Sequence, residues 1–174
     1  MDSGCPVATA APVAWGSCAD WLSNTSAIPT AQCGTVSVPV DWANDQGAQA
    51  QLAVIRVPAS GERLGVLMVN PGGPGASAVD TVAGMGAALA DTEIGRRFDL
   101  VGFDPRGVGH STPQLRCRTD AEIDAYRREP LADYSPAGVA HIEGLHRQFA
   151  QQCLDRMGAP FLANVGSAST VRDM

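Results

Sequence analysis

The sequence predicts an α/β fold in which a mostly parallel sheet has an antiparallel start and is followed by a helical segment. Three observations predict it. Two alternating apolar segments flank a polar turn; an apolar run, a stretch of small residues and a second apolar run then succeed one another; and the rest of the chain has helical spacing without strands. With 174 residues, 45% of them hydrophobic, the chain can bury the core of an ordinary domain.

The first strands are predicted by alternation and by turn residues. Residues 1–34 are rich in Ala, Pro, Ser and Cys with little periodicity, and they predict an extended N-terminal arm. Thr35–Val40 alternates, and Gln51–Val57 follows the turn-forming residues 44–47, so the two segments predict a hairpin. The short apolar run Gly65–Val69 is bounded by Gly and Pro. It is typical of a strand buried on both faces.

A strand–helix–strand unit follows. Residues 77–90 are small and favour a helix that packs closely on a sheet, and Phe98–Phe103 is the next strand. Strands joined through a helix run parallel, so the sheet is expected to become parallel here. Residues 35–112 are therefore expected to hold the first strands of the core.

Residues 113–166 predict a helical insertion. Thr119 and Glu122 form a capping box for a short helix, and Ser135 followed by proline opens a longer one. Apolar side chains at helical spacing predict the buried stripe of the longer helix, and these are Val139, Ile142, Leu145, Phe149, Cys153, Leu154 and Met157. Residues 167–174 are expected to begin a further helix, without a terminating signal.

Composition disfavours several classes of function. A net charge of −6 with thinly spread cations argues against nucleic-acid binding. No apolar run is long enough for a transmembrane segment, and no signal peptide is visible. The five cysteines form no C-x-x-C pair and have no histidines at metal spacing, so neither a metal nor a cofactor is expected. They could be buried thiols or disulfides.

The turn "NPGGPGAS" at residues 70–77 could hold a phosphate or an oxyanion. Gly73, Gly75 and Ala78 match G-x-G-x-x-A, and Asp104 ends the next strand, as in a dinucleotide-binding fold. However, the two prolines remove N–H donors from the turn, and the acid lies further away than the usual ~20 residues. No lysine follows the glycines, which excludes a P-loop.

An oxyanion fits the turn better. Acyl transfer needs donors aimed at one developing negative oxygen, and backbone N–H groups on a rigid turn supply them. Glycines let these groups approach a bound carbonyl, while the prolines fix the shape of the turn. In an α/β-hydrolase sheet this donor turn follows the third strand, which is the place that residues 70–77 occupy here.

Two long motifs in register carry a resemblance to a known family. "NPGGPGAS" followed by "FDLVGFDPRGVGHSTP" resembles the secreted tripeptidyl aminopeptidases of actinobacteria, relatives of proline iminopeptidases with the α/β-hydrolase fold. W-x-x-C at Trp15–Cys18 and C-x-x-V-x-V-P-x-D at Cys33–Asp41 also match, so the resemblance covers most of residues 15–113. Mycobacterial cell-envelope peptidases belong to the same group.

The resemblance implies which residues form the site. The backbone at Gly72 and Gly73 would form part of the oxyanion hole, with Gly73 as the first choice of N–H donor. Asn70 stands where the iminopeptidase relatives place His, so no role is assigned to it. The turn after the fourth strand would be structural, with Asp and Arg bonding to backbone or to each other, and its residues are Asp104, Arg106, Gly107 and Gly109.

The resemblance further implies the N-terminal part of an exported serine peptidase that removes short peptides from free N-termini. The elbow G-x-S-x-G, the acid and the histidine are absent from these residues, and residues 167–174 would begin the helix before that elbow. Ser77 is expected to cap a helix, while Ser111 and its neighbour His110 are not expected to form a dyad. The remaining histidines, His141 and His146, are expected on the surface.

Export to the cell surface or envelope would favour disulfides over thiols. The favoured pairs are Cys18 with Cys33 and Cys117 with Cys153, which leaves Cys5 for a link to the remaining C-terminal part of the hydrolase. The substrate would be a peptide or an ester. Two alternatives stay open, namely an esterase of the same fold and a non-catalytic binding or scaffold domain that retains the half-fold.

Overall fold

The computed structural model describes residues 12–174 and divides them into two units. The first unit contains the residues up to Val38 together with Ala50–Pro113, and it holds most of the sheet. The second contains Pro39–Gln49 together with Gln114–Met174, and it holds four helices. Among the described residues, no helix combines the length and the apolar character that crossing a membrane requires.

One four-stranded mixed sheet has the strand order β1-β2-β4-β3. Its strands are β1 (Gln32–Pro39), β2 (Gln49–Val57), β3 (Gly65–Val69) and β4 (Phe98–Phe103). β4 runs antiparallel to β2, with Val54 opposite Phe103, and parallel to β3, with Val69 opposite Gly102. The predicted α/β fold, antiparallel at its start and parallel from β3 onward, is confirmed.

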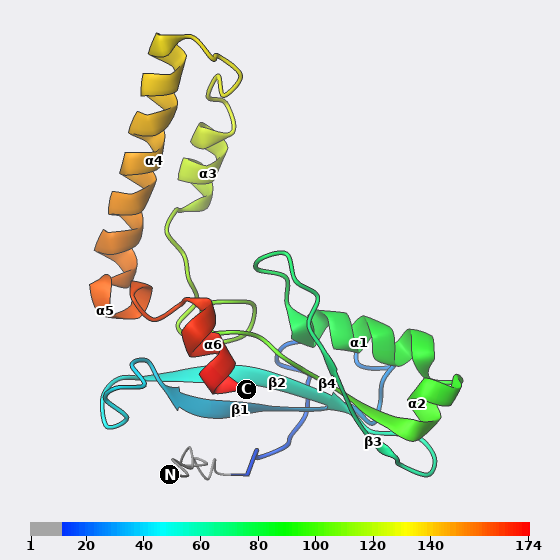
Figure 1. Cartoon of the computed structure of the whole chain (residues 1–174). Helices are drawn as coiled ribbons and strands as arrows, with labels where there is room; N and C mark the ends of the chain where they lie inside the picture. Colours follow the sequence, from blue (N-terminus) through cyan, green and yellow to red (C-terminus); the bar gives the residue numbers. More distant parts are fainter. Residues whose placement is uncertain (1–11) are drawn as a thin grey trace, which may run out of the picture. The chain divides into compact units, whose positions relative to one another are not determined.

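Helix α1 (Ala78–Leu89) connects β3 to β4 and lies along the sheet (Figure 1). Ser77 caps it as predicted, because its side-chain oxygen accepts a hydrogen bond from the Asp80 N–H at 3.1 Å. The small buried residues of α1 pack into a core with β2, β4 and a disulfide, and its members are Cys18, Cys33, Ala53, Ile55, Val79, Val82 and Leu100. The short helix α2 (Glu93–Arg97), capped by Thr92, leads into β4, and no sequence pattern predicted it.

Gly102 of β4 lies where α1 packs closely on the sheet. A Cβ added there would lie 2.8 Å from Val82 Cγ2 and 2.9 Å from the Ala78 carbonyl oxygen. We expect Gly102→Ala to lower the free energy of unfolding by about 1–3 kcal/mol, because α1 must move away from β4. Urea unfolding followed by circular dichroism measures this loss. In the control Gly84→Ala, nothing lies within 4 Å of the added Cβ. Equal losses in the two variants would contradict the close packing.

Strand β3 is not buried on both faces, so that prediction is wrong. The side chains of Val66, Leu67 and Met68 are 47%, 38% and 50% exposed. Successive strand residues point to opposite faces, so both faces of β3 are open. The physical reason is position, since β3 stands at the edge of the sheet and is paired only with β4 within the described part of the chain.

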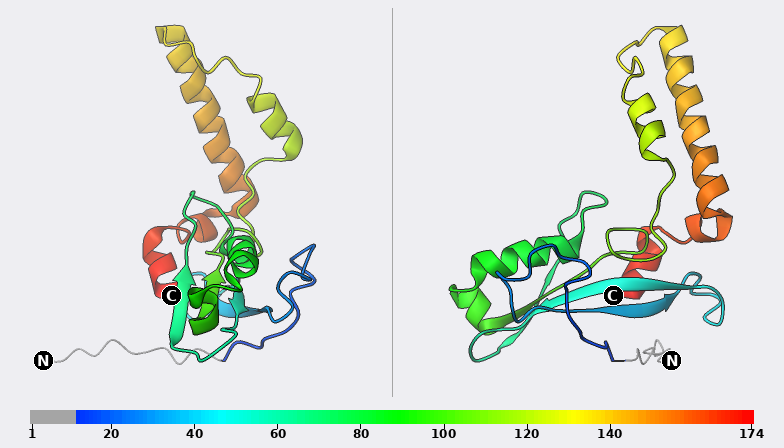
Figure 2. Two further views of the ribbon diagram at one scale, coloured as in Figure 1. Left: turned by 90° about the vertical axis from the view of Figure 1, so that its right-hand side faces the viewer. Right: turned by 180° about the vertical axis from the view of Figure 1, so that it is seen from behind.

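The second unit contains the helices α3 (Asp120–Tyr126), α4 (Pro136–Met157), α5 (Ala159–Leu162) and α6 (Ser167–Asp173). α3 lies beside α4 in both views of Figure 2. The two predicted helix starts are confirmed. Thr119 and Glu122 form a full capping box on α3, and Ser135 caps α4 with Pro136 in its first turn. The hairpin turn of this unit contacts its last helix, because Trp42 Nε1 donates to Asp173 Oδ1 at 3.1 Å.

The predicted stripe of α4 is at most half-buried, so the prediction of a buried stripe is wrong. Val139, Phe149 and Leu154 are 43%, 41% and 43% exposed, and Gly138 is the buried residue of the helix. α3 is much shorter than α4 and covers only part of it. Where the two helices meet, the Arg118 guanidinium lies over the rings of Tyr126, at 4.3 Å, and Phe149, at 4.7 Å.

Glu122 makes this helix pair sensitive to acid. The hydrogen bond from Arg156 to its carboxylate at 2.9 Å, and that from the Thr119 N–H at 2.7 Å, lower the pKa of Glu122 from 4.5 to about 2. A carboxyl whose pKa is lower in the folded state contributes stability above its unfolded pKa, and this contribution is lost as the pH falls through the folded pKa.

We therefore expect Glu122→Gln to be less stable than the parent protein at pH 7, with the difference shrinking between pH 4.5 and about 2. Thermal unfolding across this pH range measures the difference. Glu143, which pairs with Arg147 on the surface of α4, offers the control Glu143→Gln. A Glu122→Gln deficit that does not change with pH would contradict the assignment.

Candidate functional site

The glycine-rich turn between β3 and α1 has a backbone that only glycine adopts readily. Gly72, Gly73 and Gly75 have φ angles of 77°, 123° and 96°. These positive angles disfavour residues with a Cβ. A Cβ added to Gly73 would lie 2.9 Å from the Gly75 nitrogen and 3.0 Å from the Ala76 nitrogen. The turn therefore brings the Gly73, Gly75 and Ala76 backbone groups close together.

Its two candidate N–H donors are in different situations. The Gly72 N–H donates to the side-chain oxygen of Asn70 at 3.0 Å, so it is already engaged. The Gly73 N–H donates to none of the residues that the structure describes. Asn70, to which the sequence assigned no role, thus holds the turn in shape. The Gly73 N–H remains available for a bound group.

Asp104, just after β4, connects two glycine-rich turns. These are residues 70–77 and the turn 104–111 that Asp104 itself begins. Its side chain is fully buried. One carboxylate oxygen accepts from the Val79 N–H at 3.2 Å, and the other accepts from Ser77 Oγ at 3.1 Å and the His110 N–H at 2.8 Å. A buried carboxylate is costly without such donors, and the N-terminus of α1 adds a favourable dipole. Asp104 thus bonds to backbone N–H groups, one of the two modes that the sequence left open, and to the Ser77 hydroxyl.

The turn that follows Asp104 is tightly packed. Gly107 and Gly109 have φ angles of 84° and 53°, and a Cβ on Gly109 would collide with the Asp104 carboxylate. Arg106 is buried as well. Ser111 is fully buried, and its hydroxyl donates to the Asp104 carbonyl oxygen at 2.6 Å while accepting from the Ala53 N–H at 2.9 Å. These bonds occupy the Ser111 hydroxyl in a structural role.

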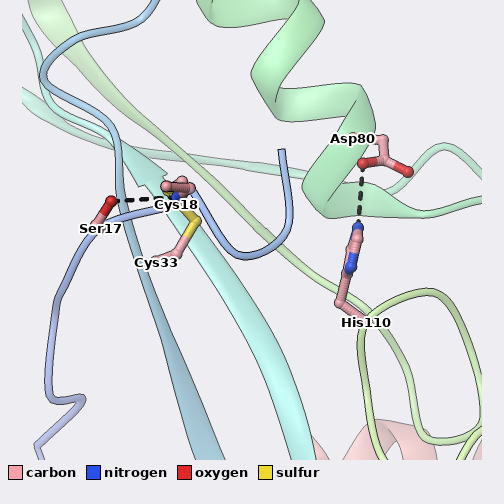
Figure 3. The surroundings of a disulfide bond; sticks show 6 residues. Ser17, Cys18, Cys33, Asp80 and His110 are labelled. Atoms are coloured by element: carbon pink, nitrogen blue, oxygen red, sulfur yellow. Dashed lines mark hydrogen bonds and ion pairs between the residues drawn. A yellow bond between two sulfur atoms is a disulfide. The ribbon is translucent and has the colours of Figure 1, made fainter. Parts of the chain in front are cut away.

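His110 lies at the surface of this region and contacts two neighbours that the sequence did not reveal. Its Nε2 is 3.2 Å from Asp80 Oδ1 in the first turn of α1 (Figure 3). Its ring stacks on that of Trp21, with centroids 5.6 Å apart. Trp21 belongs to the arm closed by the disulfide, so this contact spans 89 positions in sequence and has no local signal. His110 faces Asp80 and Trp21 rather than Ser111.

The comparison with protein families decides the class of the molecule. Residues 65–157, more than half of the chain, match the family model described as the alpha/beta hydrolase fold. The chain belongs to this family. The matched region begins at β3, includes both glycine-rich turns of the α/β hydrolase and ends with α4.

Individual relatives agree. Carboxylesterase B of Mycobacterium tuberculosis is 67% identical over 171 residues, which are 98% of this chain and 33% of that protein. Serine protease Hip1 of the same species is 45% identical over 163 residues, 94% of this chain and 31% of that protein. The tripeptidyl aminopeptidase of Streptomyces lividans is 38% identical over 177 residues, with shares of 96% and 31%. The resemblance inferred from the sequence is confirmed, and the chain spans about a third of the length of these relatives.

A serine hydrolase of this fold carries its nucleophile in G-x-S-x-G, which these 174 residues lack. Ser77 and Ser111 both serve structural hydrogen bonds in the α/β hydrolase unit. His141 pairs with Glu129, and its Nε2 lies 2.8 Å from Glu129 Oε2. The structure thus contains a candidate oxyanion donor, and none of its described serines is bonded to a histidine.

Two disulfides stabilise the hydrolase chain, and they are the pairs that the sequence favoured. Cys18 and Cys33 join the arm to β1 (Figure 3). Cys117 and Cys153 join the segment before α3 to α4. Cys5, proposed as a link to another polypeptide, lies outside the described residues. No group of three or more His, Cys, Asp or Glu side chains among residues 12–174 is arranged to hold a metal ion.

Proposed function

We propose that this chain contributes the oxyanion hole of an exported serine peptidase that releases short peptides from free N-termini. One observation carries the proposal. The Gly73 N–H lies on the turn between β3 and α1 and has no partner among the described residues, whereas the neighbouring Gly72 N–H is held by Asn70. An unengaged N–H at the position where α/β hydrolases stabilise a tetrahedral intermediate is suited to that task.

The chemistry needs a serine hydroxyl outside these residues. Its oxygen would bond to the scissile carbonyl carbon, its proton would pass to a histidine, and the carbonyl oxygen would take up the electron pair as an oxyanion. The Gly73 N–H would donate to that oxygen, together with the N–H after the nucleophile. Collapse would expel the amine with the proton from histidine. Water would then release the acyl group.

The remaining parts of the machinery are proposed for the rest of a longer polypeptide. Its relatives are about three times as long as this chain, and the elbow motif is absent here. Residues 35–112 would carry the core and the oxyanion turn, 113–166 a helical insertion, and 167–174 the start of the helix before the nucleophile. Cys5 would be available for a link to the C-terminal part.

The disulfides support export. The chain contains two disulfides, and such bonds persist in oxidising environments outside the cytosol. The surface or envelope of the cell is therefore the proposed location. Peptides or esters are the proposed substrates, since the same oxyanion donor serves both.

A second candidate function is an esterase. It is favoured by one specific observation, because a relative that is 67% identical is named a carboxylesterase, while the 45% and 38% relatives carry peptidase names. The ratio of kcat/KM for a tripeptide anilide to that for a short acyl ester would separate the two candidates.

Fluorophosphonate labelling of the protein as isolated, read by intact mass with and without reducing agent, tests the proposal. We expect a label on the polypeptide segment that follows this chain, and none on Ser77 or Ser111. Absence of any label, with full folding, would support a binding or scaffold domain instead. A label on a segment released only by reduction would add support for the Cys5 link.

A further inference from the structure

Both ends of the glycine-rich turn are attached to the same strand. At its start, Val69 of β3 pairs with Gly102 of β4. At its end, Ser77 bonds through its hydroxyl to Asp104, two residues further along the chain from Gly102. Gly73 lies between these two attachments. The two segments that lead to Gly73 are therefore both anchored at β4 or at the residue that follows it.

The Asp104 carboxylate bonds to several groups at once. It accepts hydrogen bonds from the Ser77 hydroxyl, from the Val79 N–H in the first turn of α1 and from the His110 N–H. Ser77 in turn accepts from the Asp80 N–H, so hydroxyl and carboxylate together satisfy two of the orphan N–H groups at the start of α1. A shift of the carboxylate would move Ser77 and the helix start together.

We propose that Asp104 is a positioning residue for the oxyanion donor, holding the Gly73 N–H in place through Ser77 and the first turn of α1. The effect on catalysis rests on the proposed function. The structural role, in which Asp104 holds the turn in place through Ser77, does not depend on it. Asp104 is buried, so the proposed role is to act through the turn rather than by contact with a bound substrate. Loss of its bonds should weaken binding of the transition state more than binding of the substrate.

Asp99 offers a matched control on the same strand. It is also buried, and it accepts from the Ala59 N–H and from Arg63 Nε, both at 2.9 Å. Neither donor belongs to the glycine-rich turn. Asp99→Asn and Asp104→Asn therefore make the same chemical change at two buried carboxylates of one sheet, and only the second can reach Gly73.

The test compares Asp104→Asn, Ser77→Ala and Asp99→Asn in the full-length protein. We expect Asp104→Asn to lower kcat by about 10-fold or more with KM nearly unchanged, because misplacement of a reacting group acts on the chemical step. Ser77→Ala should lower kcat less, and Asp99→Asn should leave it within about twofold. Equal kcat losses in the two Asp→Asn variants, or a normal kcat in Asp104→Asn, would overturn the proposal.

Hydrogen exchange of the peptide that covers residues 70–77 provides the second readout. It should be faster in Asp104→Asn and Ser77→Ala than in the parent protein, and unchanged in Asp99→Asn. If the parent protein is not a hydrolase, the proposed function fails while this exchange pattern still decides the positioning role. If Asp104→Asn does not fold, Ser77→Ala decides it, and parent-like exchange in Ser77→Ala then counts against the proposal.

Discussion

If the proposed function holds, replacing Gly73 with alanine should lower kcat of the full-length protein about 10²–10³-fold, which corresponds to about 2.7–4 kcal/mol of transition-state stabilisation. The Gly73 φ of 123° disfavours alanine, and its Cβ would press on the Gly75 and Ala76 nitrogens at 2.9 and 3.0 Å. The turn must then rearrange, and the Gly73 N–H no longer points at the oxyanion. Steady-state kinetics on an activated ester would measure kcat and KM separately.

The control is Gly158→Ala. Gly158 ends α4 with a φ of 75°, and an alanine Cβ there would meet nothing closer than Pro160 at 3.8 Å. It imposes a similar backbone strain without touching the proposed site. We expect it to lower the melting temperature without a comparable loss of kcat. If Gly73→Ala keeps the parent kcat while folding normally, the Gly73 N–H is not the oxyanion donor.

Removing the Cys117–Cys153 disulfide should have the largest effect on stability. The bond closes a loop with a sequence separation of 36. The loop-entropy model then gives a loss of about 4 kcal/mol in the free energy of unfolding for Cys117→Ala with Cys153→Ala. The contact between α3 and α4 otherwise depends on surface groups such as Arg118 and Glu122. Urea unfolding followed by far-ultraviolet circular dichroism measures the loss.

The second disulfide provides the comparison. Cys18 and Cys33 are separated by 15 residues, so the same model gives about 3 kcal/mol for their replacement by alanine. Because this pair belongs to the buried core, its loss should unfold the sheet unit as a whole. Limited proteolysis should instead cut the Cys117/Cys153 variant within residues 114–157 first. Identical cleavage patterns in both variants would contradict this assignment.

Local signals in the sequence predicted the strands and the longer helices, but not the short helices α2 and α5. Ser77, Thr119 and Ser135 each cap the helix that their pattern indicated, because a cap depends on residues within one turn. The glycine-rich turn was located for the same reason, since its glycines and prolines restrict the backbone directly. Family resemblance then gave the fold, which the family match confirmed.

Contacts between distant segments were not predictable. Nothing near Asp104 in sequence indicates that it reaches Ser77, and Trp21 carries no signal for His110. Burial failed for a related reason. The apolar residues of β3 and α4 indicate that these elements can be buried. Whether they are buried depends on which other segments pack against them. The oxyanion role of Gly73 stays a prediction, supported by its unengaged N–H.

The open side of β3 has a consequence for this chain on its own. β3 has an edge with no strand partner among residues 12–174 and exposes Val66, Leu67 and Met68, so it is a template on which a second molecule can continue the sheet. At high concentration, these 174 residues alone should associate through that edge, and sedimentation velocity should detect oligomers that Leu67→Lys diminishes. The backbone hydrogen bonds that join neighbouring strands within a longer sheet would here join strands of separate molecules.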